Sequence, residues 1–85
     1  MEDIKFMQKE HLSILNDLYT HQNGCKEMVE LIEDCLEILT ELTQLELCFY
    51  TDGKIEIDDL REVYESSIDF KRYLNDFIKK YKLTN

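Results

Sequence analysis

Alanine and proline are absent from this chain, and glycine and arginine occur only twice each among its 85 residues. All four residues use GC-rich codons, so their scarcity indicates an AT-rich genome, such as that of a low-GC bacterium, a phage or a large DNA virus. Alanine is the best helix former, and its absence therefore reflects coding bias more than fold. No repeat or low-complexity linker interrupts the sequence, so we expect residues 1–85 to form a single helical domain.

Cysteines and long apolar runs are also scarce. Cys25, Cys35 and Cys48 are odd in number, and they form no CxxC pair. A secreted disulfide framework has an even count with tight spacing, so we expect reduced thiols. No run approaches the ~18 apolar residues of a membrane span, and the acidic opening MEDIKFMQKEH does not resemble a signal peptide. These features predict a cytoplasmic protein.

Basic residues are outnumbered by acidic ones, 10 to 19, which gives a formal net charge of −9. Duplex DNA and RNA attract proteins of the opposite sign, so we expect no direct nucleic-acid binding. Anionic membrane surfaces are disfavoured for the same reason. A protein with a basic surface is the partner that this charge favours, because its approach would be electrostatically steered.

Apolar residues recur at helical spacing in three stretches, which the two glycines separate. The pattern predicts an all-α fold, an antiparallel three-helix bundle with helices at about 3–21, 25–50 and 57–82. A homodimer or other homo-oligomer is an open alternative, because so short a chain buries a limited core. The predicted buried stripes are Ile4, Met7, His11, Ile14 and Leu18; Met28, Leu31, Cys35, Ile38, Leu42 and Leu45; and Leu60, Val63, Ser67, Phe70, Leu74, Phe77 and Tyr81.

Further apolar residues widen all three stripes, and Leu15 and Tyr19 widen the first one. Val29, Ile32, Leu36 and Leu39 flank the second one. An arc this wide predicts that the middle helix is central and touches both others. Tyr64, Ile68 and Ile78 extend the third stripe in the same way.

Two places leave alternatives open. The run CFYT-DG-KIEI within residues 47–57 has the pattern of a β-hairpin. We favour the alternative, in which one helix ends here, a short loop follows and a new helix begins. Ser66-Ser67-Ile68-Asp69 has the pattern of a helix cap. The third helix therefore either runs through this point or breaks there.

Residues Thr51 to Leu60, TDGKIEIDDL, resemble the second half of an EF-hand calcium loop. Gly53 takes the place of the sharp-turn glycine, and Asp52 and Asp59 fall on ligand positions. The chain departs from the family pattern at the first and third ligand positions, which are Cys48 and Tyr50. The resemblance implies a degenerate metal-binding module, whereas the missing carboxylates predict that the loop binds calcium weakly or not at all. We therefore expect no metal site, and we expect no other cofactor.

The most distinctive predicted surface is an acidic face on the second helix, formed by Glu30, Glu33, Asp34, Glu37 and Glu41. Three aromatic residues fall outside the apolar stripes, and we take them as candidate partner contacts. These residues are Phe6, Tyr50 and Tyr73.

No Ser-His-Asp order, glycine-rich phosphate loop or paired-carboxylate pocket is recognisable, so we assign no catalytic residue and expect no enzyme. The sequence favours a small acidic protein-binding module that serves as an adaptor, regulator or inhibitor. One alternative is a nucleic-acid mimic that blocks a DNA- or RNA-binding protein through the acidic helix face. The second alternative is the EF-hand-like metal module.

Overall fold

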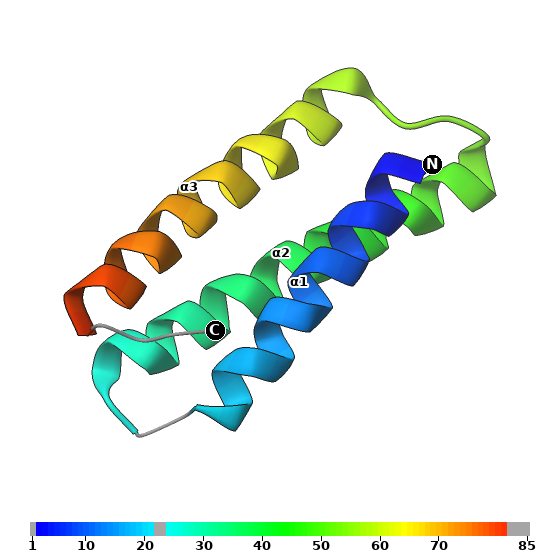
Figure 1. Cartoon of the computed structure of the whole chain (residues 1–85). Helices are drawn as coiled ribbons and strands as arrows, with labels where there is room; N and C mark the ends of the chain where they lie inside the picture. Colours follow the sequence, from blue (N-terminus) through cyan, green and yellow to red (C-terminus); the bar gives the residue numbers. More distant parts are fainter. Residues whose placement is uncertain (1, 22–23, 82–85) are drawn as a thin grey trace.

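The computed structural model describes residues 2–21 and 24–81, and three long helices dominate it (Figure 1). They are α1 (Glu2–Thr20), α2 (Lys26–Asp52) and α3 (Ile57–Tyr81). Both α1 and α3 pack on α2 and run antiparallel to it, which confirms the all-α prediction and the central place of the middle helix. The molecule is 43 Å long, close to the roughly 40 Å expected of a helix as long as α2. Residue 82, the predicted end of the third helix, lies outside the described residues.

Residues suited to helix ends define the limits of α2. Cys25 is its N-cap, with extended backbone angles and a sulfur that accepts a hydrogen bond from the Met28 amide at 3.4 Å. Gly53 ends it in the left-handed conformation, with φ of 75°, and donates its amide to the Phe49 carbonyl at 2.9 Å. A residue with a Cβ is strained at such an angle, which is why glycine suits this position.

The connection between α2 and α3 is short and contains no hairpin. The middle helix continues two residues past its predicted end, through Asp52, and residues 53–56 link it to α3. The described part of the chain contains no strand. α3 passes through Ser66 and Ser67 without a break, so the continuous-helix alternative is correct.

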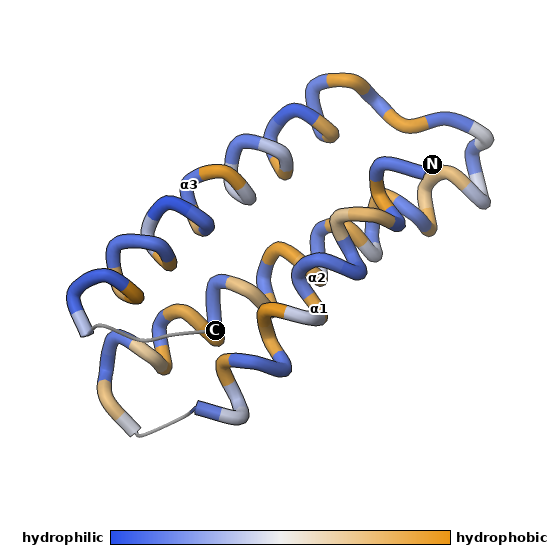
Figure 2. The backbone as a smooth tube through the Cα atoms, in the orientation of Figure 1, coloured by the Kyte–Doolittle hydropathy of each residue, from blue (hydrophilic) through white to orange (hydrophobic). Residues whose placement is uncertain are grey.

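The core follows the predicted stripe on α2 closely, since all six of its residues are buried. α1 adds Ile4, Met7, His11 and Leu18, and α3 adds Val63, Ser67, Phe70 and Phe77. The matching apolar positions recur at regular intervals along all three helices (Figure 2). Not every position of the other two stripes is buried: Ile14, Leu60 and Leu74 are half-buried, and Tyr81 is exposed.

α1 and α3 stay apart from each other. Within the described ranges, no Cα of α1 lies within 8 Å of a Cα of α3. The prediction that Tyr64 and Ile68 extend the buried face of α3 is therefore wrong, because no helix lies close enough to cover them; their exposures are 56% and 40%. Among the residues that flank the α2 stripe, Val29 and Leu36 are exposed, Leu39 is half-buried and Ile32 is buried.

Candidate binding surfaces

The acidic face predicted on α2 is largely solvent-exposed. Glu30, Glu33, Asp34 and Glu37 are exposed and Glu41 is half-buried. None of the ion pairs within residues 2–21 and 24–81 involves any of the five. The negative charge of this face is therefore not neutralised by lysine or arginine from the described chain.

The structure adds carboxylates from α3 to this face. Two adjoining hollows of about 490 and 290 Å³ run between α2 and α3 and share Glu41 and Ser66. We call them together the acidic groove, because six carboxylates and no lysine or arginine line this part of the described surface. The carboxylates are Asp34, Glu37 and Glu41 from α2 and Asp59, Glu62 and Asp69 from α3.

The groove includes only part of the predicted face, since Glu30 and Glu33 do not line it. Sequence reasoning missed the three carboxylates of α3. The sequence could have indicated their place beside the core, because each directly precedes a residue of the predicted stripe: Asp59 precedes Leu60, and Glu62 precedes Val63. Neighbouring positions on a helix point in different directions around it, so this row forms one side of the buried stripe.

The floor of the acidic groove is apolar. Ile38 and Leu45 of α2 and Val63 and Phe70 of α3 are buried residues that line it. Each of the four is at most 8% exposed, so they belong to the core and are touched from outside only through the groove. The surface thus combines a narrow apolar strip with carboxylates on both sides.

Tyr73 lies at one end of the acidic groove and is 39% exposed. Partial burial raises the pKa of its phenol, and the nearby charges of Glu30, Glu27 and Asp34 raise it further against the opposing effect of Lys80. The structure therefore brings this candidate contact and the acidic residues together. An exposed phenol in a negative field suits contact with a cation.

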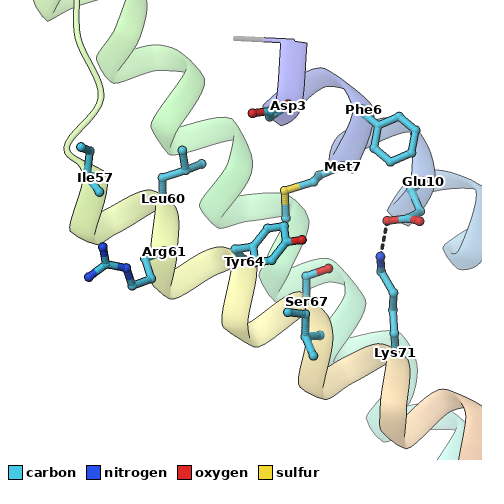
Figure 3. A pocket seen from close by; sticks show the side chains of 11 residues that line it. Asp3, Phe6, Met7, Glu10, Ile57, Leu60, Arg61, Tyr64, Ser67 and Lys71 are labelled. Atoms are coloured by element: carbon cyan, nitrogen blue, oxygen red, sulfur yellow. Dashed lines mark ion pairs between the residues drawn. The ribbon is translucent and has the colours of Figure 1, made fainter.

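A second groove, a hollow of about 480 Å³, lies between α1 and α3 (Figure 3). We call it the apolar groove, because its lining includes Phe6, Ile57, Tyr64 and Ile68, all between 40% and 70% exposed. Its charged residues are Asp3 and Glu10 on α1 and Arg61 and Lys71 on α3. Lys71 Nζ lies 2.6 Å from Glu10 Oε1, so an ion pair crosses the groove (Figure 3).

The three candidate aromatic contacts do not form one surface. Phe6 lines the apolar groove and Tyr73 the acidic groove, whereas Tyr50 lines neither. The exposed ring of Tyr50 packs edge-on against Phe49, with 5.8 Å between the ring centroids. Its predicted role as a partner contact is the one that the geometry supports least.

His11 is the main titratable group of the core and is fully buried. Nδ1 lies 2.8 Å from the Met7 carbonyl, which can only accept, so this nitrogen carries the hydrogen. Nε2 lies 3.1 Å from Ser67 Oγ on α3 and accepts from that hydroxyl. Burial lowers the pKa of the imidazole, so the neutral form is favoured. His11 thus joins α1 to α3 through a hydrogen bond.

The thiols and the EF-hand-like segment form no recognisable metal centre. Cys35 is buried and donates to the His11 carbonyl at 3.2 Å, and burial raises its thiol pKa to about 11. Residues 48–52, which would hold the first ligand positions of a calcium loop, belong to α2 rather than to a loop. The described chain contains no group of three or more histidine, cysteine or acidic residues placed to hold a metal ion.

Comparisons with protein-family models, with curated proteins and with solved structures found no match. Within the described residues, none of the helices is both long enough and apolar enough to span a bilayer.

Proposed function

We propose that this protein is a non-catalytic, cytoplasmic protein-binding module that holds a basic segment of a partner in the acidic groove. The module would act as an adaptor, regulator or inhibitor of that partner. One observation carries the proposal: six carboxylates from two helices border one groove, and no lysine or arginine lines it in the described chain.

Repulsion among the carboxylates supports a cationic occupant. Like charges at neighbouring helical positions destabilise a helix slightly, and Glu37 and Glu41 stand in this i, i+4 relation. Asp59 and Glu62 repeat a close spacing on the opposite side of the groove. Lysine or arginine from a partner would relieve this repulsion, and the net charge of −9 would speed the encounter.

The apolar floor supports a peptide segment rather than free cations. Lysine and arginine bury their aliphatic stems along apolar surfaces while their charged ends stay in polar surroundings. Stems lying over Val63 and Phe70 would place the charged ends among Glu37, Glu62 and Asp69. Tyr73, at the groove end, offers a ring face for a further cation.

The first prediction concerns where a basic peptide binds. The double variant Glu37→Gln/Glu62→Gln neutralises one carboxylate on each side of the groove. We expect it to weaken binding of a lysine- and arginine-rich amphipathic peptide by roughly tenfold. The measurement is isothermal titration calorimetry at low and at moderate salt, with weaker binding at higher salt because exposed charges are screened.

The matched control is Glu33→Gln/Glu65→Gln. It also removes one exposed carboxylate from α2 and one from α3, but neither residue lines the groove. Net charge changes equally in both variants, so the control separates the effect of where the carboxylates lie from the effect of the total charge. Equal weakening by the two pairs would mean that overall charge, and not the groove, attracts the peptide.

The nucleic-acid-mimic hypothesis uses the same surface with a different partner. The observation in its favour is that rows of carboxylates stand on both sides of one groove, contributed by α2 and α3. Competition decides between the two functions. The test uses a partner captured by wild type and by the control pair, but not by the groove pair. At a salt concentration that suppresses non-specific binding of basic segments to phosphates, duplex DNA or RNA should displace this partner if the protein acts as a mimic and should leave it bound otherwise.

A further inference from the structure

The apolar groove between α1 and α3 exposes apolar side chains that the described chain does not cover. Phe6 is 66% exposed, Ile57 70% and Tyr64 56%, and all three line the same hollow. Figure 3 shows these side chains on the facing sides of the two helices. Exposed apolar residues that gather in one concave place mark an interaction surface.

The charges around this groove favour a second copy of the chain as its occupant. The acidic residues, Asp3 and Glu10, are on α1, and the basic residues, Arg61 and Lys71, are on α3. The lining is therefore neutral in sum, in contrast to the acidic groove and to the whole chain, whose net charge is −9. A strongly basic or acidic partner gains nothing from a neutral lining, whereas two copies of an acidic chain repel each other least across such a surface.

We propose that the apolar groove is the interface of a homodimer. The two copies would be related by a two-fold axis parallel to the groove, which places α1 of each copy over α3 of the other. The acidic edge of one copy then faces the basic edge of the other, twice, as a self-complementary interface requires. A two-fold axis across the groove would instead place α1 over α1, with acids facing acids.

The groove size and the position of its side chains fit this pairing. A hollow of about 480 Å³ is too small for a whole partner helix and admits a few large side chains. Phe6 lines it from α1 and Tyr64 from α3, and both are more than half exposed, so in the dimer each copy would place these rings against the apolar lining of the other. Desolvated aromatic anchors of this kind carry most of the binding energy of an interface.

The dimer leaves the acidic groove free. The residues of α3 that line the two grooves, such as Glu62 and Asp69 in one and Tyr64 and Lys71 in the other, lie on opposite sides of the helix. A dimer would therefore present two acidic grooves and bind a partner with two basic segments more tightly than a monomer would. The inference does not depend on the proposed function, because dimerisation is measured without any partner.

The test is sedimentation equilibrium over a wide concentration range. We expect wild type to approach twice the chain mass of 10.3 kDa. Phe6→Glu should weaken dimerisation by roughly tenfold or more, because it places a charge among the apolar side chains of the interface. Tyr50→Glu is the matched control: it changes an equally exposed aromatic residue to the same charge outside both grooves and should leave the dimer intact.

A charge-reversal cycle tests the orientation and does not rely on Phe6. Asp3→Arg and Arg61→Asp should each weaken the dimer, and the double variant should restore it, because acid again faces base across the two-fold axis. Circular dichroism confirms that each variant remains helical. A monomer at every concentration, a dimer unaffected by Phe6→Glu, or a double variant weaker than both single variants would overturn the proposal.

Discussion

The imidazole of His11 lies in the core with both of its nitrogens hydrogen-bonded, one to its own helix and one to α3. Its ring also lies 5.7 Å from the ring of Phe70, centroid to centroid. Protonating it would place a charge in this apolar setting and oblige the Ser67 hydroxyl to turn from donor to acceptor. The hydrogen-bonding arrangement therefore belongs to the neutral histidine.

A pH dependence of stability follows. Burial lowers the pKa of His11, Lys71 acts in the same direction, and the Met7 carbonyl and Glu10 oppose it. Cys35 of α2 is neutral in this pH range, since its pKa is about 11. A depressed histidine pKa means that the unfolded chain binds the proton first. The contribution of neutral His11 to the free energy of unfolding should be complete above about pH 6.5. It should be lost as the pH falls from there through the folded-state pKa, and the free energy of unfolding should drop by at most about 1.4 kcal/mol per pH unit.

Urea denaturation between pH 7.5 and 5 measures this effect. His11→Gln should unfold more easily at every pH, but its free energy of unfolding should depend much less on pH than that of wild type. His21→Gln, which changes an exposed histidine, should keep the pH dependence of wild type. Glu27 does not interfere, because its pKa is lowered by hydrogen bonds from Lys80 and Tyr81, and its contribution is lost only at more acidic pH. If His11→Gln kept the pH dependence of wild type, His11 would not be the group responsible for it.

At the scale of the helices, the ends of α2 are set by single residues. Gly53 adopts φ of 75°, and a Cβ placed there would meet no atom within 4 Å. The cost of Gly53→Ala is therefore strain in the backbone and not a clash, and we expect a loss of about 1 kcal/mol. Chemical denaturation measures it. Gly53→Asn is the comparison, since asparagine tolerates the left-handed conformation better than alanine and should cost less.

The sequence predicted helices well because each has a regular apolar stripe and suitable ends. It left residues 47–57 ambiguous, because Asp52-Gly53 suits a hairpin turn and a helix C-cap equally well by local pattern. The structure decides for the cap, since α2 continues through residues 48–52. The ambiguity at Ser66–Ser67 had the same origin. Ser67 is part of the core because it pairs with His11, 56 positions away in the chain, and no local pattern reveals such a contact.

The candidate surfaces were predicted only where they lie on one helix. The face of α2 from Glu30 to Glu41 was visible in the periodicity, but the acidic groove needs Asp59, Glu62 and Asp69 from α3. The apolar groove was missed because Tyr64 and Ile68 have the spacing of buried residues. Their exposure depends on how far α3 stands from α1, which is a property of tertiary packing and is not encoded in the period of either helix.

At the scale of the whole molecule, α2 holds the fold together. It contacts both other helices, while α1 and α3 are joined across their gap by polar links, the His11–Ser67 hydrogen bond and the Glu10–Lys71 ion pair. The open side of this arrangement is the apolar groove, and the other flank of α3 bears the acidic groove. Two distinct surfaces on an 85-residue chain are thus a consequence of one central helix with two separated neighbours.

The last prediction follows from that dependence on α2. Leu42 is fully buried at the centre of the helix, so Leu42→Ala leaves a cavity in the core that both neighbours share. Large-to-small changes of this kind cost about 2–5 kcal/mol. Leu47→Ala, five residues further along the same helix, should cost far less because that side chain is 58% exposed. Urea unfolding followed by circular dichroism compares the two.

We expect Leu42→Ala to unfold in a single cooperative step. α1 and α3 make no close backbone contact with each other, so neither can stay folded once its packing on α2 is lost. Hydrogen exchange provides the second measurement. In Leu42→Ala, the amides of α1 and of α3 should lose protection together, because both helices depend on the same central surface. Comparable losses in Leu42→Ala and Leu47→Ala, or protection that remains in α1 after α3 has opened, would contradict a fold organised around α2.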